Sequence, residues 1–128
     1  MNNKIRYANL IFVIRGEKVK LTKRLNTIAD LVNRNSIVAD VGTDHGYIPK
    51  YLIEKEIAKL VIATDISKGS LEKTINYIKE EDLSEYIITR LGNGLQPIKP
   101  FEVDTVIIAG MGGLLIVDIL EESKDKLD

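Results

Sequence analysis

The segment from Asp40 to Tyr47 combines glycines and acidic residues in a pattern that suits binding of a small ligand. Gly42 and Gly46 allow tight backbone turns and a close approach to a ligand. The dinucleotide-binding sequence G-x-G-x-x-G has a glycine where this chain has Asp44. The Asp44 carboxylate would repel a pyrophosphate at the start of the following helix, whereas it would attract a ligand with a cationic amine and a sulfonium. A plain strand-to-helix turn is the alternative.

Asp65 is a second candidate, because it follows the glycine turn by roughly the 20 residues that separate a ribose-binding acid from such a turn. A carboxylate at this distance can accept hydrogen bonds from both hydroxyls of a ribose. The alternative is an aspartate that caps the helix expected after Ser67.

Two further glycine-rich turns follow. Asn93, between Gly92 and Gly94, carries an amide that can both donate to and accept from an adenine edge. An ordinary turn is equally consistent with that composition.

The last turn contains Ala109, Gly110, Met111, Gly112 and Gly113. Its three glycines leave backbone amides open where a substrate would meet the cofactor, whereas a purely structural turn needs fewer.

Short apolar runs alternate with amphipathic segments along the chain, and each of the four turns follows one of the runs. The pattern predicts strands over 36–41, 60–65, 86–91 and 103–109, and helices over 22–33, 47–56, 67–79 and 114–123. Thr22 and Ser67 are the expected N-caps of two helices. Alternating strands and helices indicate an α/β fold with a Rossmann-like, doubly wound parallel sheet. In such sheets, ligands bind at the carboxyl ends of the strands.

The composition restricts the possible functions. A chain of 128 residues that is 45% hydrophobic and 29% charged is expected to form one globular domain. It has no cysteine and a single histidine, so we expect no disulfide, thiolate metal site or histidine-rich metal site. Its apolar runs are too short for a membrane span or a signal peptide, which predicts a cytoplasmic protein without a membrane partner.

Positive charge is concentrated near the N-terminus, although the net charge is −1. Residues 1–24 contain seven lysines or arginines and one acidic residue, Glu17. Such a basic arm is compatible with phosphate contact, and a solvated terminus is the alternative.

The chain resembles the bacterial tRNA adenine-22 N1-methyltransferase family over residues 21–128. The resemblance rests on three segments: Leu21-Thr22-Lys23-Arg24-Leu25, Ala39-Asp40-Val41-Gly42-Thr43-Asp44-His45-Gly46-Tyr47 and Ile108-Ala109-Gly110-Met111-Gly112-Gly113. It implies a catalytic domain that uses S-adenosylmethionine as methyl donor and N1 of an adenine in the tRNA D arm as acceptor. Residues 1–20 have no counterpart in the family and are interpreted as a basic extension.

The motifs and the resemblance together assign expected roles to individual residues. The expected cofactor-binding residues are Asp40, Gly42, Asp44, His45, Gly46, Asp65, Asn93, Gly94, Ala109 and Gly110. The expected substrate-binding residues are Arg24, Tyr47, Gly112 and Gly113, and the candidates for a catalytic contact are Tyr47 and Met111. Adenine N1 has an in-plane lone pair, so we expect catalysis to come from alignment and exclusion of water. The adenine must first leave its stack.

Two other interpretations stay open at this point. Family members continue beyond the fourth strand, so the chain is either part of the enzyme or a catalytically inactive cofactor-binding fragment. In a fragment, strand 103–109 would present an unpaired edge, which favours association, although the oligomeric state does not follow from the sequence. An NAD-dependent enzyme is the third possibility, and Asp44 argues against it.

Overall fold

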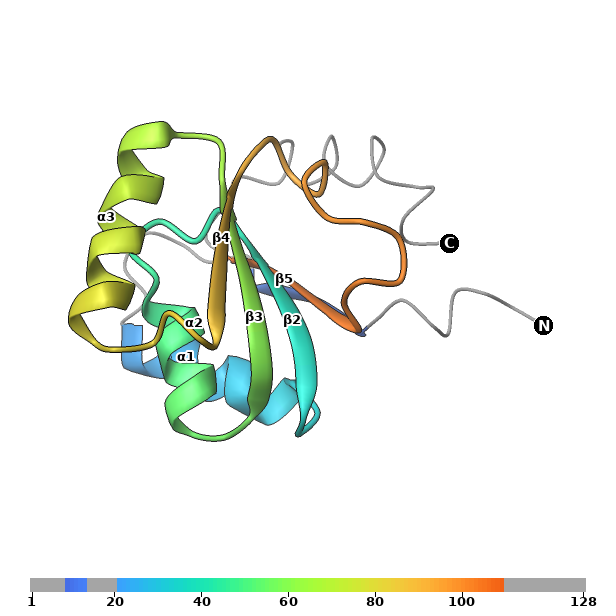
Figure 1. The fold of residues 1–128 in the computed structure, drawn as a ribbon. Helices are drawn as coiled ribbons and strands as arrows, with labels where there is room; N and C mark the ends of the chain where they lie inside the picture. Colours follow the sequence, from blue (N-terminus) through green and yellow to red (C-terminus); the bar gives the residue numbers. More distant parts are fainter. Residues whose placement is uncertain (1–8, 14–20, 110–128) are drawn as a thin grey trace.

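Five strands form one parallel sheet in the computed structural model, which describes residues 9–13 and 21–109 (Figure 1). The elements are β1 (Asn9–Val13), α1 (Leu21–Leu31), β2 (Ser36–Val41), α2 (Tyr47–Glu54), β3 (Ala58–Asp65), α3 (Lys68–Glu80), β4 (Ile87–Leu91) and β5 (Thr105–Ala109). The strand order is β1-β5-β2-β3-β4, with every neighbouring pair parallel. This arrangement confirms the predicted Rossmann-like α/β class.

The strand β1 was not predicted, because the segment 1–20 shows no sustained hydrophobic period. It pairs with β5 in register from Asn9 opposite Thr105 to Val13 opposite Ala109. β5 therefore has neighbours on both sides, and the expectation of an unpaired edge on this strand was wrong. This pairing gives hydrogen-bond partners to backbone groups of β5 that would otherwise be unpaired at the sheet edge.

The other described elements agree with the prediction to within a few residues. β2 has the predicted bounds, and α3 begins after Ser67, whose Oγ accepts a hydrogen bond from the Ser70 N–H at 3.2 Å. The prediction of Thr22 as an N-cap was wrong, because α1 already begins at Leu21. The helix expected over 114–123 lies outside the described residues.

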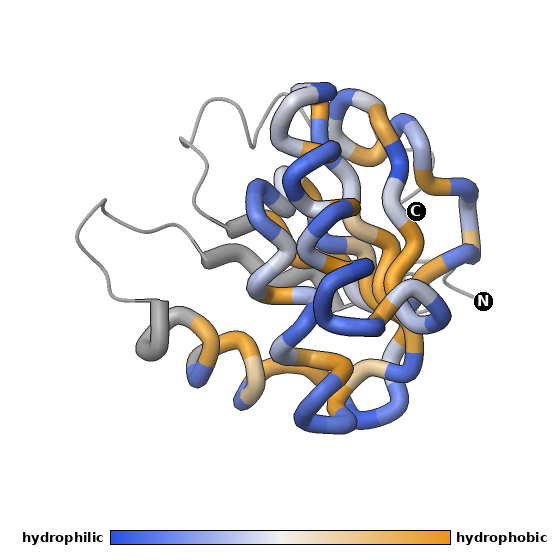
Figure 2. Tube along the Cα trace, turned by 60° about the vertical axis from the view of Figure 1, so that its left-hand side comes forward, coloured by the Kyte–Doolittle hydropathy of each residue, from blue (hydrophilic) through white to orange (hydrophobic). Residues whose placement is uncertain are grey.

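One face of the sheet is covered by α1, α2 and α3. Ile28, Leu52 and Ile78 from these helices pack in one apolar cluster with Val38 and Val61 of the sheet. Figure 2 shows the hydrophobic strands in the interior and alternating hydrophobic and hydrophilic residues along the helices. On this face, α2 begins near the carboxyl end of β2 and α3 begins near the carboxyl end of β3.

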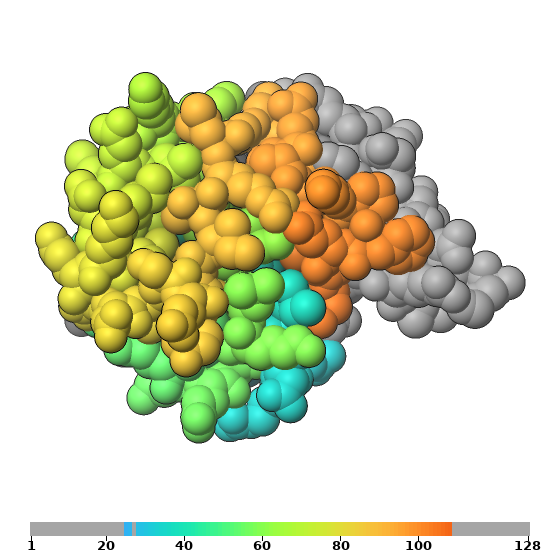
Figure 3. Space-filling view, viewed as in Figure 1, coloured from blue at the N-terminus to red at the C-terminus, as the bar shows by residue number. Residues whose placement is uncertain are grey.

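The other face is covered, in the part of the chain that the structure describes, by the segment between β4 and β5. Leu95, Ile98 and Val103 of this segment pack with Ile62 and Ile108 of the sheet. In the views of Figure 1 and Figure 3 this segment, coloured orange, lies on the side of the sheet away from the helices. Because successive strand residues point to opposite faces, β2 and β5 are buried on both sides.

Candidate functional site

The turns that follow β2 and β4 are both hydrogen-bonded to the carboxyl end of β3. The N–H groups of Gly42 and Thr43 donate to the carbonyl oxygen of Thr64, both at 2.9 Å. The N–H of Gly92 donates to the carbonyl oxygen of Asp65, also at 2.9 Å. Three of the four predicted motifs therefore meet at one edge of the sheet, because adjacent parallel strands end there.

The turn between β2 and α2 uses the left-handed backbone region three times. The φ angles are 70° at Gly42, 63° at Asp44 and 82° at Gly46. A Cβ atom on Gly46 would lie 3.0 Å from Cγ2 of Thr74 in α3. Gly46 therefore allows α3 to pack closely against the turn, a role within the chain that the ligand-based interpretation did not include. At Asp44 the same left-handed conformation is held by aspartate, one of the few residues besides glycine that adopt it readily.

The Asp65 carboxylate connects the turn after β2 to the start of α3. Its Oδ2 accepts the Asp44 N–H at 3.1 Å, and its Oδ1 accepts the Ser67 N–H at 3.0 Å. The residue is 8% exposed. Asp65 is not the cap of α3, because Ser67 is the N-cap and accepts the Ser70 N–H. Each oxygen keeps a further lone pair, so the carboxylate can also accept hydrogen bonds from a ligand.

Two more side chains of the first motif are buried at the carboxyl end of β2. Asp40 lies between Ala63 and Ile107 of the neighbouring strands. Thr43, which the sequence analysis did not select, is also buried, and its Oγ1 has no hydrogen-bond partner among the described residues. A buried hydroxyl normally has a partner, so Thr43 becomes a candidate ligand contact. Its place inside the glycine motif was the available signal.

An aromatic cluster lies beside the glycine turn. The rings of His45 and Tyr47 are stacked, with centroids 5.2 Å apart and planes at 7°. Tyr77 of α3 meets the Tyr47 ring edge-on, at 5.5 Å and 88°. Nδ1 of His45 lies 3.0 Å from Oδ2 of Asp44. Tyr47 is 41% exposed, so burial in the core does not account for its position. The sequence analysis did not select Tyr77, because its contact with Tyr47 joins residues that are far apart in the sequence.

Lys50 of α2 supports this cluster from the side of α3. Its Nζ lies 5.5 Å from the ring centroid of Tyr77 and forms ion pairs with Glu81 and, at 3.9 Å, with Glu54. The hydrogen bond to Glu81 is the main reason that the pKa of Lys50 is raised above its ordinary value. Lys50 is therefore a charged link between α2 and α3.

The turn after β4 places Asn93 and Gly94 at the same edge. Asn93 is partly exposed, and its carbonyl accepts the Gln96 N–H at 3.0 Å. Gly94 is buried with a φ of 59°, and its carbonyl accepts the Thr64 hydroxyl at 3.5 Å. Asn93 thus lies in the turn at the carboxyl end of β4, and its contact with an adenine stays a prediction.

Several predicted residues cannot be placed. Ala109 ends β5, and the backbone of Arg24 lies in α1, but their side chains are outside the described residues. Gly110, Met111, Gly112 and Gly113 also lie outside them.

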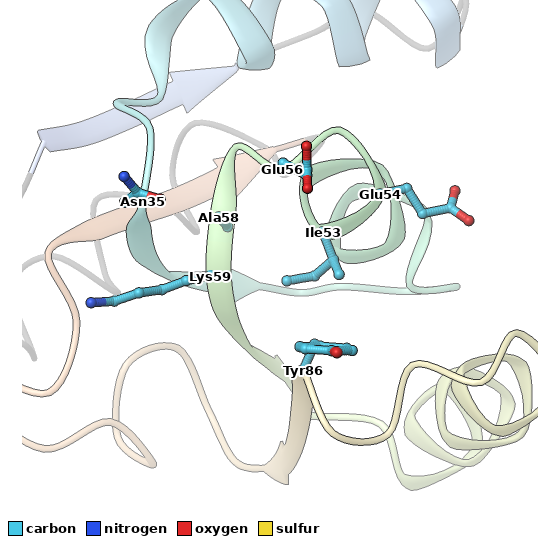
Figure 4. A pocket seen from close by; sticks show the side chains of 7 residues that line it. All are labelled: Asn35, Ile53, Glu54, Glu56, Ala58, Lys59 and Tyr86. Atoms are coloured by element: carbon cyan, nitrogen blue, oxygen red, sulfur yellow. The ribbon is translucent and has the colours of Figure 1, made fainter.

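A separate cavity of about 480 Å³ lies at the opposite edge of the sheet, near the amino ends of β3 and β4. It is lined by Asn35, Ile53, Glu54, Glu56, Ala58, Lys59 and Tyr86. Figure 4 shows Ile53 and Tyr86 facing each other across it. None of the predicted site residues contributes to it, so it is distinct from the carboxyl-end site.

Two kinds of feature were searched for in the described ranges. Within residues 9–13 and 21–109, no three histidine, aspartate or glutamate side chains are grouped as metal ligands. Among the helices in these ranges, none has the length and apolar character that crossing a membrane requires.

Comparison with known proteins identifies the family of this chain. Residues 21–128 match a family described as a methyltransferase domain. The chain is 41% identical over 110 residues to the tRNA (adenine(22)-N(1))-methyltransferase of Bacillus subtilis (strain 168), covering 86% of this chain and 46% of that protein. The sequence-based resemblance is thereby confirmed. The chain spans about half the length of the curated relatives it matches.

Solved structures give the same result. The crystal structure of the Bacillus subtilis tRNA methyltransferase TrmK shares 40% identity at a TM-score of 0.79, covering 85% of this chain and 47% of that one. A Streptococcus pneumoniae protein solved in complex with S-adenosyl-L-methionine shares 38% identity at a TM-score of 0.78, with coverage of 84% and 51%.

Proposed function

Because the chain belongs to the methyltransferase domain family, we propose that it binds S-adenosylmethionine at the carboxyl ends of β2, β3 and β4 and serves methylation of adenine N1 in the tRNA D arm. The observation that carries this proposal is the convergence of the turns after β2 and β4 on the end of β3 at Asp65. The cofactor, when bound, supplies an electrophilic methyl group on a sulfonium. The name of the Bacillus subtilis relative supports the choice of acceptor.

The side chains at this edge fit such a ligand. Asp65 is fixed by two backbone N–H groups and keeps lone pairs for ribose hydroxyls. The exposed carboxylate of Asp44 suits a cationic group, and the buried hydroxyl of Thr43 is available for a polar contact. Asn93 is our candidate for contact with the adenine edge. A pyrophosphate would instead meet the Asp44 carboxylate at the start of α2, which disfavours NAD.

The acceptor side rests on fewer described residues. Tyr47 is exposed beside the glycine turn and is our candidate contact for the adenine, with Met111, Gly112 and Gly113 as further candidates. Arg24 is a candidate for the cofactor carboxylate or a tRNA phosphate. Adenine N1 carries its own lone pair, so these residues would align the base and exclude water rather than remove a proton. A tRNA substrate agrees with the predicted cytoplasmic location.

Calorimetric titration of the chain with S-adenosylmethionine and, separately, with NAD tests the cofactor. We expect saturable heat with S-adenosylmethionine and none with NAD. Heat with NAD alone would overturn the assignment.

Transfer is tested by incorporation of tritiated methyl groups into tRNA, followed by nucleoside analysis. We expect little incorporation by the 128 residues alone and 1-methyladenosine from a chimera that adds the second half of the Bacillus subtilis relative. A tRNA with guanine at position 22 is the control. Equal methylation of that control would refute adenine 22 as the methylated position. A chimera that binds S-adenosylmethionine but transfers no methyl group would favour the inactive-fragment alternative.

A further inference from the structure

The stacked rings of His45 and Tyr47 form an exposed surface at the carboxyl edge of the sheet. We propose that this pair is a stacking platform for a nucleobase of single-stranded RNA, and that Tyr77 and Lys50 are positioning residues that hold Tyr47 in place. The inference rests on the proposed function, because it supplies the contact for an unstacked base next to the cofactor site.

The geometry of the pair suits a third ring. Nearly parallel planes with centroids 5.2 Å apart describe an offset stack, the arrangement that aromatic rings prefer. The His45 side chain is 46% exposed and Tyr47 is 41% exposed, so both rings present surface to solvent. A base gains binding free energy by stacking on an aromatic side chain, largely independently of its identity.

Core packing does not require Tyr47 at this position. The apolar face of α2 is supplied by Ile48 and Leu52, which are buried against the sheet. Tyr47 instead meets Tyr77 edge-on at 5.5 Å, outside that cluster. The Tyr77 contact fixes the plane of the Tyr47 ring, because an edge-to-face pair restricts rotation of both rings.

Lys50 holds Tyr77 in turn. Its ammonium group lies 5.5 Å from the centroid of the Tyr77 ring and is paired with Glu81 and Glu54. A lysine with two carboxylate partners is poorly suited to bind a phosphate. Its position therefore favours a supporting role for the ring cluster over contact with the RNA backbone.

The charges around the platform favour a base over a phosphate. Asp44 lies beside His45, at 3.0 Å from its Nδ1, and Glu81 and Glu54 neutralise the nearby lysine. An anionic backbone would be repelled here, whereas the uncharged face of a base would not.

The first experiment measures binding of a fluorescein-labelled adenosine-rich RNA octamer by anisotropy, together with S-adenosylmethionine affinity by calorimetry. We expect Tyr47→Leu to weaken RNA binding about tenfold and Tyr77→Leu about three- to tenfold, with cofactor affinity changed by less than about twofold. Tyr77→Phe keeps the edge-on ring and should restore binding. Tyr86→Leu is the control, since Tyr86 is 46% exposed but lies at the opposite edge.

Lys50 in α2 and Lys55, the C-cap residue of that helix, provide a second matched test. Lys50→Gln should weaken RNA binding to about the same extent as Tyr77→Leu. Lys55→Gln should not, although Lys55 also lies over a tyrosine, 6.0 Å from the ring centroid of Tyr51. Circular dichroism verifies that each variant is folded.

The outcomes separate this inference from the proposed function. RNA binding that depends on Tyr47 and Tyr77 without S-adenosylmethionine binding supports the platform and contradicts the cofactor assignment. Cofactor binding with RNA affinity insensitive to Tyr47→Leu and Tyr77→Leu overturns the platform. Failure of the unaltered chain to bind the octamer also overturns it.

Discussion

An ion pair between Arg90 and Glu102 holds the segment between β4 and β5 against β4. The effect of its removal on the free energy of unfolding can be estimated. Nη1 and Nη2 of Arg90 each contact one carboxylate oxygen of Glu102 at 2.7 Å. Arg90 also donates to the Pro97 carbonyl at 2.8 Å, and Glu102 accepts the Lys99 N–H at 2.9 Å. The pair therefore closes the segment that carries Asn93. Glu102→Gln replaces one acceptor oxygen by a donor and removes the charge.

The expected loss of stability follows from the pKa of Glu102. The hydrogen bonds from Arg90, more than that from the Lys99 N–H, lower this pKa from 4.5 to about 2. The difference corresponds to roughly 3 kcal/mol. Because the side chain is 24% exposed, solvent screening reduces the expected loss to about 1–2 kcal/mol. A lowered folded-state pKa gives stability that is present above pH 4.5 and is lost as the pH falls towards 2.

Urea unfolding followed by far-ultraviolet circular dichroism measures this effect. At pH 7, Glu102→Gln should lower the free energy of unfolding by about 1–2 kcal/mol, and the difference should shrink as the pH approaches 2. Glu72→Gln on the exposed surface of α3 is the control and should have little effect at either pH. A loss that is independent of pH, or no loss at pH 7, would refute the reasoning.

Three further predictions concern the turns and the sheet edge. Asp65→Ala should weaken S-adenosylmethionine binding by about 1.5–3 kcal/mol and also lower stability, because two backbone N–H groups lose their acceptor. Calorimetry with unchanged affinity in a folded variant would exclude Asp65 from the ligand site. Gly46→Ala should lower the free energy of unfolding by about 1–2 kcal/mol through backbone strain, and further through a close contact with Cγ2 of Thr74. In urea unfolding, the double variant Gly46→Ala/Thr74→Ser should recover only the part that is due to this contact. Leu10→Pro and Ile11→Pro should lower the thermal stability to different extents. Successive N–H groups of an edge strand point alternately towards and away from β5, so only one of the two prolines removes a hydrogen bond between the strands. Equal effects would contradict the pairing of β1.

The sequence by itself determined the succession of strands and helices from α1 to β5 and the place of the first three motifs at strand ends. β2, the N-cap at Ser67 and the helix start at Tyr47 followed from local hydrophobic period and turn residues. These signals act over a few neighbouring residues, so they can be recognised from the sequence alone. The parallel sheet then follows from the alternation of elements, and with it the meeting of Gly42, Asp65 and Asn93 at one edge.

The tertiary structure alone decided which residues touch across long stretches of chain. It placed residues 9–13 beside β5, although their short apolar run has no distinguishing period. It also assigned two backbone partners to Asp65, buried the Thr43 hydroxyl and brought Tyr77 against Tyr47. Such contacts depend on how helices and strands pack, and the pattern of neighbouring residues carries no record of a partner about thirty positions away.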